Sequence, residues 1–276
     1  MTALPLTTSD FDYISALVRE HSAIVLETGK EYLVQSRLQP LAQQLGLRDI
    51  SALVDRLKRG EPVLALQVVE AMATHETSFF RDMHPFDALR DVVLPELIGA
   101  RAPQRTLRIW SAAASTGQEA YSIAITLREH FAELSDWKVS ILATDLSSAV
   151  IDRAREGRYS QIEINRGLPA PILLKYFERD GAGWRARPEI RRMVEFRTLN
   201  LVRPWPALGR FDLIFLRNVL IYFDVTTKRE VLANVRKLMA PDGYLFLGSA
   251  ESTLQYDSSF AKTSAPRAAA YRLIRP

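Results

Sequence analysis

The run Leu107-Arg-Ile-Trp-Ser-Ala-Ala-Ala-Ser-Thr-Gly-Gln-Glu119 is the most informative part of this sequence. Its first four residues are typical of a short buried strand, and its last two begin a segment with helical apolar spacing. Between them, Ala112, Ala114 and Gly117 stand at the spacing of G-x-G-x-x-G, with two glycines replaced by alanine. Such a turn lets a ligand approach the unpaired N–H groups of a helix start. A turn of small residues can equally serve close packing, so this motif alone leaves both interpretations open.

A second apolar strand signal, Val139-Ser-Ile-Leu-Ala-Thr144, ends directly before Asp145. In a βαβ unit, an acidic residue at the tip of the second strand can accept both ribose hydroxyls of a nucleoside. The same side chain could instead cap the helix predicted over Ser147–Arg153, and it could do both. Together with the small-residue turn, Asp145 favours a cofactor that contains a nucleoside.

Length and composition indicate a globular protein with one large domain and a smaller one. The 276 residues are 47% hydrophobic and 25% charged, and none is cysteine. The chain therefore has no disulfide and no thiolate metal site, which suits a reducing compartment. The first ten residues lack the basic and apolar regions of a signal peptide, and no apolar run approaches the ~18 residues of a membrane span. We therefore expect a cytoplasmic protein without direct membrane insertion.

The net charge of +4 is unevenly distributed. Residues 1–90 carry nine Lys and Arg against twelve Asp and Glu, whereas residues 91–276 carry 27 against 20. The positive excess could steer the larger part toward acidic surfaces, although a solvated surface is the simpler interpretation. The chain has no dense basic tract with interleaved aromatic residues, so we expect no nucleic-acid partner.

Residues 1–72 have helical spacing and no strand signal, which predicts a small all-α N-terminal domain. The first predicted helix begins at the capping residues Thr8, Ser9 and Asp10, and the second spans Tyr32–Leu45 with a bend at Pro40. The third begins at Asp49, and the fourth runs from Pro62 to Met72. Between Lys30 and Arg59, six basic residues stand against three acidic ones. This basic face could bind an acidic partner, although a solvated helix surface is the simpler interpretation.

Residues 73–100 connect this domain to the first strand. The part Thr74-His-Glu-Thr-Ser-Phe-Phe-Arg-Asp82 fits neither a helical nor a strand period, and Pro85–Ile98 is predicted to be helical. One interpretation is a linker anchored by Phe79 and Phe80. The other is a segment folded over the cofactor site.

Residues 101–276 alternate strand and helix signals, which predicts a mostly parallel sheet covered on both faces. After Asp145 the predicted elements are a helix Ala149–Arg155, a loop to Leu168, a hairpin of Leu173–Arg179 and Trp184–Arg187, a strand Val194–Leu199, a strand Phe211–Leu216, a helix over 226–239, a turn Pro241–Gly243, a strand Tyr244–Gly248 and an antiparallel edge strand Ala269–Ile274. Ligands of such sheets bind at the carboxyl ends of the strands, where we expect Glu119, Asp145, Asn200 and Asn218.

Five phrases carry a resemblance to a known family: RIWSAAASTGQEAYS, LATDL, LNL followed by PWP, FDLIFLRNVLIYFD, and PDGYLFLGSAES. They resemble CheR, the chemotaxis receptor methyltransferase, and the resemblance covers nearly the whole chain. It implies a doubly wound, Rossmann-like class I methyltransferase domain over 101–276, with a small inserted β-subdomain at about 160–192. It implies S-adenosylmethionine as methyl donor. The implied acceptors are glutamate γ-carboxylates on the cytoplasmic helical bundle of chemoreceptors, whose methylation serves sensory adaptation.

The resemblance also implies a set of cofactor contacts and no metal. Carried over residue by residue, these contacts fall on His75, Thr77, Arg81, Glu119, Asp145, Asn200, Leu201, Asn218 and Val219. His75 stands where the family usually has asparagine. The triplet Gln118-Glu119-Ala120 keeps the second carboxylate of the usual Glu-Glu-Pro, and Ala114 replaces a common cysteine.

A glutamate acceptor is already ionised at neutral pH, because its reference pKa is about 4.3, so the reaction requires no strong general base. The barrier then falls mainly through desolvation and in-line alignment, which is consistent with a sequence that shows no catalytic triad. Tyr222 is the candidate catalytic residue, with its hydroxyl holding the acceptor carboxylate. The alternative is an ordinary core aromatic within Leu220-Ile-Tyr-Phe223.

Two other classes of function stay open: a methyltransferase for a different protein or small-molecule acceptor, and a non-catalytic regulator that binds the cofactor. A nicotinamide enzyme is disfavoured because alanines at 112 and 114 crowd a pyrophosphate.

The compact turn Asp180-Gly-Ala-Gly183 resembles family members that do not tether themselves to a receptor C-terminal pentapeptide. We therefore expect docking that is independent of the pentapeptide. The candidate docking residues in the helical domain are Arg37, Arg48, Arg56 and Lys58.

Overall fold

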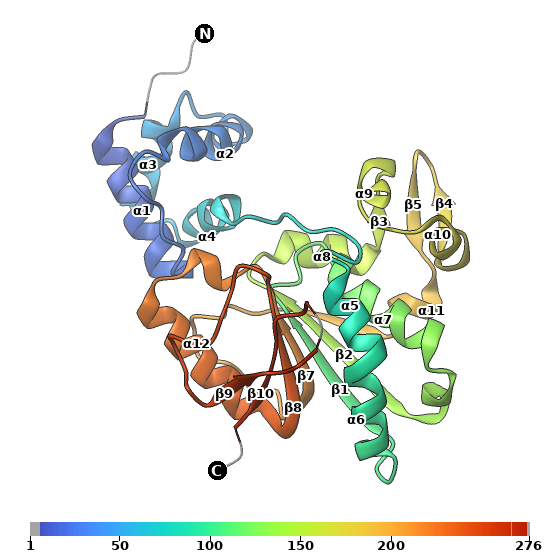
Figure 1. The fold of residues 1–276 in the computed structure, drawn as a ribbon. Coiled ribbons are helices and arrows are strands. Elements are labelled where there is room, and N and C mark those ends of the chain that lie inside the picture. Colours follow the sequence, from blue (N-terminus) through green and yellow to red (C-terminus); the bar gives the residue numbers. More distant parts are fainter. Residues whose placement is uncertain (1–5, 266, 275–276) are drawn as a thin grey trace. The chain divides into compact units, whose positions relative to one another are not determined.

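The computed structural model describes residues 6–265 and 267–274, and the chain divides into two compact units (Figure 1). The helical unit combines the described residues up to Thr74 with the distant segment Tyr222–Thr227. The sheet unit comprises His75–Ile221 and the described residues from Lys228 onward.

The helical unit confirms the predicted all-α N-terminal part. Its helices are α1 (Thr8–Ser22), α2 (Glu31–Gln44), α3 (Ile50–Lys58) and α4 (Pro62–Met72). Asp49 caps α3 by accepting the N–H of Ala52 at 2.9 Å, as its position predicted. The cap of α1 is Thr7 rather than the predicted residues 8–10, since the Thr7 hydroxyl accepts the N–H of Asp10 at 3.1 Å. The core residues include Ile14, Val18, Val34, Leu38, Leu53, Val54 and Val68.

The segment Tyr222–Thr227 packs within the helical unit although it lies about 150 residues later in the chain than Thr74. The N–H of Val25 donates to the carbonyl of Tyr222 at 3.1 Å. Arg19 pairs with Asp224 at 2.9 Å between Nη2 and Oδ2. Backbone and side-chain contacts therefore both hold this segment to the N-terminal helices.

The sheet unit has the predicted Rossmann-like architecture. Within its described residues, seven strands form one sheet in the order β6-β2-β1-β7-β8-β10-β9. These strands are β1 (Thr106–Ala112), β2 (Lys138–Asp145), β6 (Val194–Thr198), β7 (Phe211–Leu216), β8 (Met239–Leu247), β9 (Phe260–Lys262) and β10 (Ala270–Leu273). β1 pairs in parallel with both β2 and β7, so the strand order reverses at β1. The ligand edge of such a sheet lies at the carboxyl ends of these three strands.

The sheet unit also contains the helices that follow or precede these strands. They are α5 (His84–Ala88), the π-helix η1 (Leu89–Val93), α6 (Leu94–Arg101), α7 (Gln118–His130), the 3-10 helix η2 (Ala132–Asp136), α8 (Ser148–Glu156), the 3-10 helix η3 (Leu220–Tyr222) and α12 (Val225–Leu238), the last two extending into residues of the helical unit. The single helix predicted over Pro85–Ile98 contains the π-helical turn η1, a wider turn than sequence spacing reveals. Trp110 of β1 is fully buried and donates its Nε1–H to Thr144 of β2 at 2.9 Å.

A second, three-stranded sheet lies between β2 and β6 in the chain. It has the order β3-β5-β4, with β3 (Arg158–Tyr159), β4 (Phe177–Asp180) and β5 (Gly183–Ala186), accompanied by α9 (Gln161–Asn165), α10 (Ala170–Tyr176) and α11 (Pro188–Arg191). The predicted hairpin is correct for β4 and β5. The prediction is wrong over 173–176, because those residues belong to α10, whose first turn contains Pro171. The predicted loop to Leu168 is also wrong in part, since Ser160 and Glu163 form a capping box that starts α9.

Two expectations near the C-terminus are corrected. The predicted turn at 241–243 lies inside β8, which starts at Met239 and has an irregular register opposite β7. β10 is antiparallel as predicted but is not the edge, because β9 pairs with its outer side. A strand of three residues such as β9 is too short for its period to be recognised. Among the described residues, no helix is both long enough and apolar enough to cross a membrane.

Candidate functional site

Asp145 meets the small-residue turn at the carboxyl edge of the sheet. The N–H of Ala114 donates to the carbonyl of Thr144 at 2.9 Å, and the N–H of Ser115 donates to Oδ2 of Asp145 at 2.8 Å. The N–H of Ser147 donates to Oδ1 of Asp145 at 3.2 Å. A carboxylate offers about four lone-pair positions, so Asp145 retains acceptor capacity for a ligand. The N-cap of α8 is Ser147. Asp145 is therefore not the helix cap that the sequence allowed as an alternative.

The turn itself has unusual backbone geometry. Ala113 and Ser115 have positive φ values of 56° and 51°, which cost about 1–2 kcal/mol each for residues with a Cβ. Gly117 has a φ of 93°, and a Cβ there would lie 3.0 Å from Cβ of Ala154 and 3.2 Å from the ring of Phe196. Close packing thus explains why position 117 is a glycine. The positive φ values of Ala113 and Ser115 are a form of backbone strain that is common at functional sites.

The carboxylate of Asp145 lies in a buried environment. Burial raises the pKa of Asp145, while the nearby His75 and the backbone N–H groups of Ser147 and Ser115 oppose the increase. Nδ1 of His75 lies 3.9 Å from Oδ1 of Asp145. The N–H of Leu199 donates to the carbonyl of Asp145 at 2.8 Å, so the next residue, Asn200, lies beside the tip of β2.

The connecting segment after Thr74 is folded against this edge of the sheet unit. The hydroxyl of Ser115 donates to the carbonyl of His75 at 2.8 Å, and the N–H of Phe80 donates to Ser122 at 2.9 Å. Phe79 is fully buried, with its ring centroid 5.0 Å from that of Tyr159. The buried Phe79 anchors the segment, as one interpretation expected, and His75 lies near Asp145. The role of the segment over a cofactor site stays a prediction.

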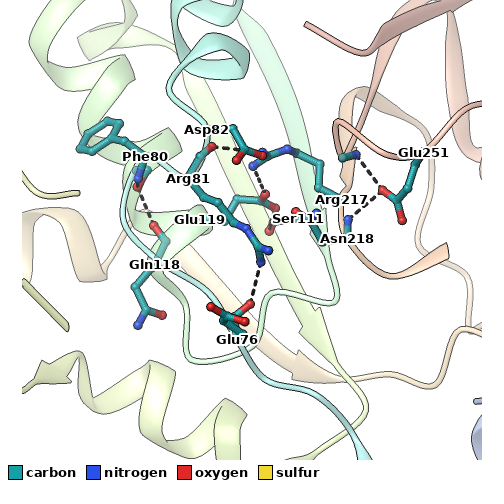
Figure 2. A network of polar contacts seen from close by, with 12 residues as sticks. Glu76, Phe80, Arg81, Asp82, Ser111, Gln118, Glu119, Arg217, Asn218 and Glu251 are labelled. Atoms are coloured by element: carbon teal, nitrogen blue, oxygen red, sulfur yellow. Dashed lines mark hydrogen bonds and ion pairs between the residues drawn. The ribbon is translucent and has the colours of Figure 1, made fainter. Parts of the chain in front are cut away.

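An ion-pair network around the buried Arg217 joins three segments of the sheet unit (Figure 2). Arg217, whose side chain is 1% exposed, donates to Oε2 of Glu119 at 3.0 Å and to Oδ2 of Asp82 at 2.8 Å. It also donates to the carbonyl of Arg81 at 3.1 Å, and Oε1 of Glu119 accepts from Ser111 at 2.8 Å. Two carboxylates thus share one guanidinium. The network carries a net negative charge, which favours a cationic group nearby.

The remaining implied contacts are distributed around the same strand ends. Arg81 donates from Nη1 to the carbonyl of Glu76 at 2.8 Å, and Thr77 is half-buried (Figure 2 shows Arg81 beside Glu76). Leu201 is buried, and its carbonyl accepts from Trp205 at 3.2 Å.

Asn218 and Val219 follow β7, and both donate backbone N–H groups to Glu251, at 2.8 and 2.9 Å. Sequence reasoning missed two residues of this region, Glu251 and Arg217. The signal for Arg217 was its place directly after β7, where the sheet's ligand edge was expected.

Tyr222, the candidate catalytic residue, belongs to the helical unit. It is half-buried, whereas the next residue, Phe223, is 7% exposed and fills the core position. Burial lowers the pKa of Arg37, and electrostatic interaction with Tyr222 raises it. Tyr222 therefore lies within electrostatic range of a charged side chain of the helical unit, and its role on the acceptor stays a prediction.

Within the part of the chain that the structure describes, no group of three or more His, Asp and Glu side chains is arranged to hold a metal ion.

Comparison with known proteins defines the class. Residues 75–269 match the family described as "CheR methyltransferase, SAM binding domain", so this part of the chain is an S-adenosylmethionine-binding methyltransferase domain. Residues 9–73 match "CheR methyltransferase, all-alpha domain". The chain belongs to the CheR methyltransferase family.

Three relatives show how far this similarity extends. Chemotaxis protein methyltransferase 1 of Pseudomonas aeruginosa is 44% identical over 248 residues, which cover 88% of this chain and 90% of the relative. Chemotaxis protein methyltransferase Cher2 of Pseudomonas putida is 42% identical over 250 residues, with the same coverages. The chemotaxis protein methyltransferase of Escherichia coli is 37% identical over 265 residues, which cover 93% of this chain and 89% of the relative.

Proposed function

We propose that this protein transfers a methyl group from S-adenosylmethionine to glutamate side chains of chemoreceptors, forming glutamate methyl esters. The observation that carries the proposal is the buried Asp145 carboxylate at the tip of β2, bonded to the N–H of Ser115 in the small-residue turn. This arrangement occurs in a chain of the CheR family. The names of the relatives support a role in chemotaxis.

The residues at the strand edge fit this cofactor. S-adenosylmethionine, when bound, supplies a methyl group on a positively charged sulfur. Asp145 has a carboxylate that can accept a hydrogen bond from a ribose hydroxyl in addition to those from backbone N–H groups. The net negative charge of Glu119, Asp82 and Arg217 suits the cationic methionine part. The further proposed contacts are His75, Thr77, Arg81, Asn200, Leu201, Asn218 and Val219.

The acceptor requires positioning more than activation. A glutamate carboxylate is ionised at neutral pH and is itself the nucleophile, so no side chain needs to remove a proton. We propose that the hydroxyl of Tyr222 donates a hydrogen bond to one carboxylate oxygen and leaves the other aligned for attack. Tyr222 would then act on turnover and not on cofactor affinity.

The docking surface that we propose lies on the helical unit and contacts acidic receptor helices. Arg56 pairs with Glu61, and Arg48 pairs with Asp49, so both charges are partly neutralised. Arg37 donates to the carbonyl of Met72 and the hydroxyl of Thr74, which are uncharged groups, and Lys58 lies 5.5 Å from the ring of Tyr13. Arg37 and Lys58 therefore carry most of the uncompensated charge of the four candidates.

We also propose that docking is independent of a receptor pentapeptide. β4 and β5 pair up to Asp180 and Gly183, which leaves a loop of two residues, Gly181 and Ala182. Gly181 has a φ of 60°, and glycine at the first loop position is typical of a tight type II′ turn.

The proposed acceptor implies a cytoplasmic location. The division into residues 1–72, 73–100 and 101–276, with a β-subdomain at about 160–192, is likewise kept as a proposal.

Calorimetry with S-adenosylhomocysteine tests the cofactor site, and label transfer from S-adenosylmethionine to receptor-rich membranes tests the acceptor. We expect clear binding of S-adenosylhomocysteine, transfer of label to membranes, and no heat on titration with the free pentapeptide. Binding with transfer only to other acceptors would support a different methyltransferase. Binding without transfer to any acceptor would support a non-catalytic regulator.

A further inference from the structure

Glu251 is a buried carboxylate that binds backbone N–H groups from two separate segments. Its Oε2 accepts from Asn218 at 2.8 Å and from Gly248 at 2.7 Å. Its Oε1 accepts from Val219 at 2.9 Å and from Ile221 at 3.3 Å. The residue is 7% exposed, so water does not compete freely for these four donors. Figure 2 shows Glu251 beside the backbone of Asn218.

The loop that Glu251 holds cannot satisfy these donors by itself. Residues 217–219 follow the end of β7 and precede the short 3-10 helix Leu220–Tyr222, so they belong to neither a sheet ladder nor a long helix. Asn218 has a φ of 57°, a left-handed conformation that asparagine adopts more readily than most residues with a Cβ. Three N–H groups directed at one carboxylate hold this backbone conformation in place.

Gly248 provides the space for this arrangement. A Cβ at position 248 would lie 2.8 Å from Oε2 of Glu251, 2.8 Å from Nδ2 of Asn218 and 3.0 Å from its backbone nitrogen. Any other residue there would push the carboxylate and the loop apart. The position of the Glu251 carboxylate therefore depends on the absence of a side chain at Gly248.

We propose that Glu251 is a positioning residue, whose carboxylate fixes the loop that presents Asn218 and Val219 to the cofactor. The inference rests on the proposed function, because these two residues are cofactor contacts only under it. The fourth donor, Ile221, belongs to the 3-10 helix Leu220–Tyr222, so the same carboxylate also holds a residue that follows the loop.

Glu251→Gln tests this role with minimal change of shape. An amide has one acceptor oxygen and directs an NH₂ group at the remaining N–H donors, so two of the four bonds are lost. We expect affinity for S-adenosylhomocysteine to fall about tenfold or more, as when buried donors lose their acceptor. We also expect faster amide hydrogen exchange over residues 218–221, with the rest of the sheet unit unchanged.

Glu163→Gln is the matched control. Glu163 also accepts a backbone N–H, that of Ser160 at 2.9 Å, but it does so in the capping box of α9. Glu163→Gln should leave cofactor affinity and amide hydrogen exchange over residues 218–221 as in the wild type. If Glu251→Gln does not fold, judged by far-ultraviolet circular dichroism, Gly248→Ala replaces it with the same criteria.

Unchanged exchange over 218–221 in the Glu251 variant overturns the inference, whatever happens to affinity. Faster exchange with unchanged affinity in a wild type that binds S-adenosylhomocysteine also overturns it, because the loop would then not matter for the cofactor. If the wild type does not bind S-adenosylhomocysteine, the proposed function fails and the cofactor role of Glu251 falls with it. Amide hydrogen exchange would then test only whether Glu251 holds the loop in place.

Discussion

Nη1 of Arg217 lies 3.0 Å from Oε2 of Glu119, and both residues are buried at the carboxyl edge of the sheet. The two residues are 98 positions apart in the sequence, and Arg217 also bonds Asp82 of the connecting segment. One guanidinium thus ties together the end of β7, the start of α7 and the segment folded against them. A charge at this depth is stable only because its partners are close.

Arg217→Met should destabilise the fold strongly. The substitution leaves the buried Glu119 without its cationic partner, and breaking one side of a buried pair typically costs about 3–5 kcal/mol. Denaturant unfolding measures the loss. Arg197→Met is the matched control, because Arg197 pairs with Glu195 in an exposed position and should change stability very little. An Arg217 variant as stable as the control would show that the network is not needed for the fold.

Asp145 should make cofactor binding depend on pH. Burial raises the pKa of Asp145 above its unfolded value of about 3.9. A raised carboxylate pKa stabilises the fold below the unfolded pKa, and this contribution is lost as the pH rises through the folded pKa. Ribose hydroxyls favour the ionised form, so affinity for S-adenosylhomocysteine should decrease as the pH falls through the raised pKa and Asp145 becomes protonated.

Asp145→Asn provides the control for this pH dependence. The variant should bind about 1.5–3 kcal/mol more weakly at neutral pH, because a charge-assisted bond is replaced by a weaker one. Its affinity should not change over the pH range in which the wild type loses binding. Parallel pH profiles in calorimetry would mean that a group other than Asp145 causes the effect.

Gly117→Ala should cost more stability than Gly29→Ala. Both glycines have a φ of 93°, so the backbone penalty of alanine is the same. A Cβ at Gly29 meets nothing within 4 Å, whereas at Gly117 it lies 3.0 Å from Cβ of Ala154. We expect an additional loss of about 1–3 kcal/mol from overpacking at Gly117, measured by chemical unfolding. Equal losses would show that the turn relaxes freely.

Tyr222→Phe should lower turnover and leave cofactor affinity unchanged. The hydroxyl is proposed to act on the acceptor carboxylate, so its loss removes an interaction of the reacting complex. Steady-state methyl transfer and calorimetry measure the two effects separately. Tyr13→Phe is a control within the helical unit, since its ring lies beside Lys58 and its hydroxyl has no proposed role. Turnover within about twofold of wild type, less than one hydrogen bond is worth, would remove Tyr222 from the mechanism.

Elements with strong start and stop signals could be predicted from the sequence. α4 runs from Pro62 to Met72 as expected, because proline suits the first helical position and the apolar spacing is regular. The predicted strands Leu107–Trp110 and Val139–Thr144 lie within the longer β1 and β2, and the predicted strand Phe211–Leu216 matches β7. The short α9 and β9 escaped prediction, because elements of three to five residues have no readable period.

Those parts of the candidate site could be predicted whose position in space is determined by the order and direction of the strands alone. Residues that directly follow parallel strands meet at one edge of the sheet, which is why Asp145 and Asn200 lie together. The pairing of Arg217 with Glu119 and Asp82 could not be predicted, because it depends on side-chain geometry between segments about 100 residues apart. The same holds for Glu251, whose partners are backbone N–H groups that have no sequence signature.

The most direct test of the proposed function is the chemical nature of the transferred methyl group. Receptor-rich membranes are incubated with this protein and S-adenosylmethionine labelled in the methyl group, and the product is then treated with alkali. Carboxyl methyl esters hydrolyse in alkali and release volatile labelled methanol, whereas methyl groups on nitrogen stay bound. We predict that the label appears on the receptors and is released as methanol. Alkali-stable label, or no label on receptors by a protein that binds S-adenosylhomocysteine, would contradict glutamate methylation.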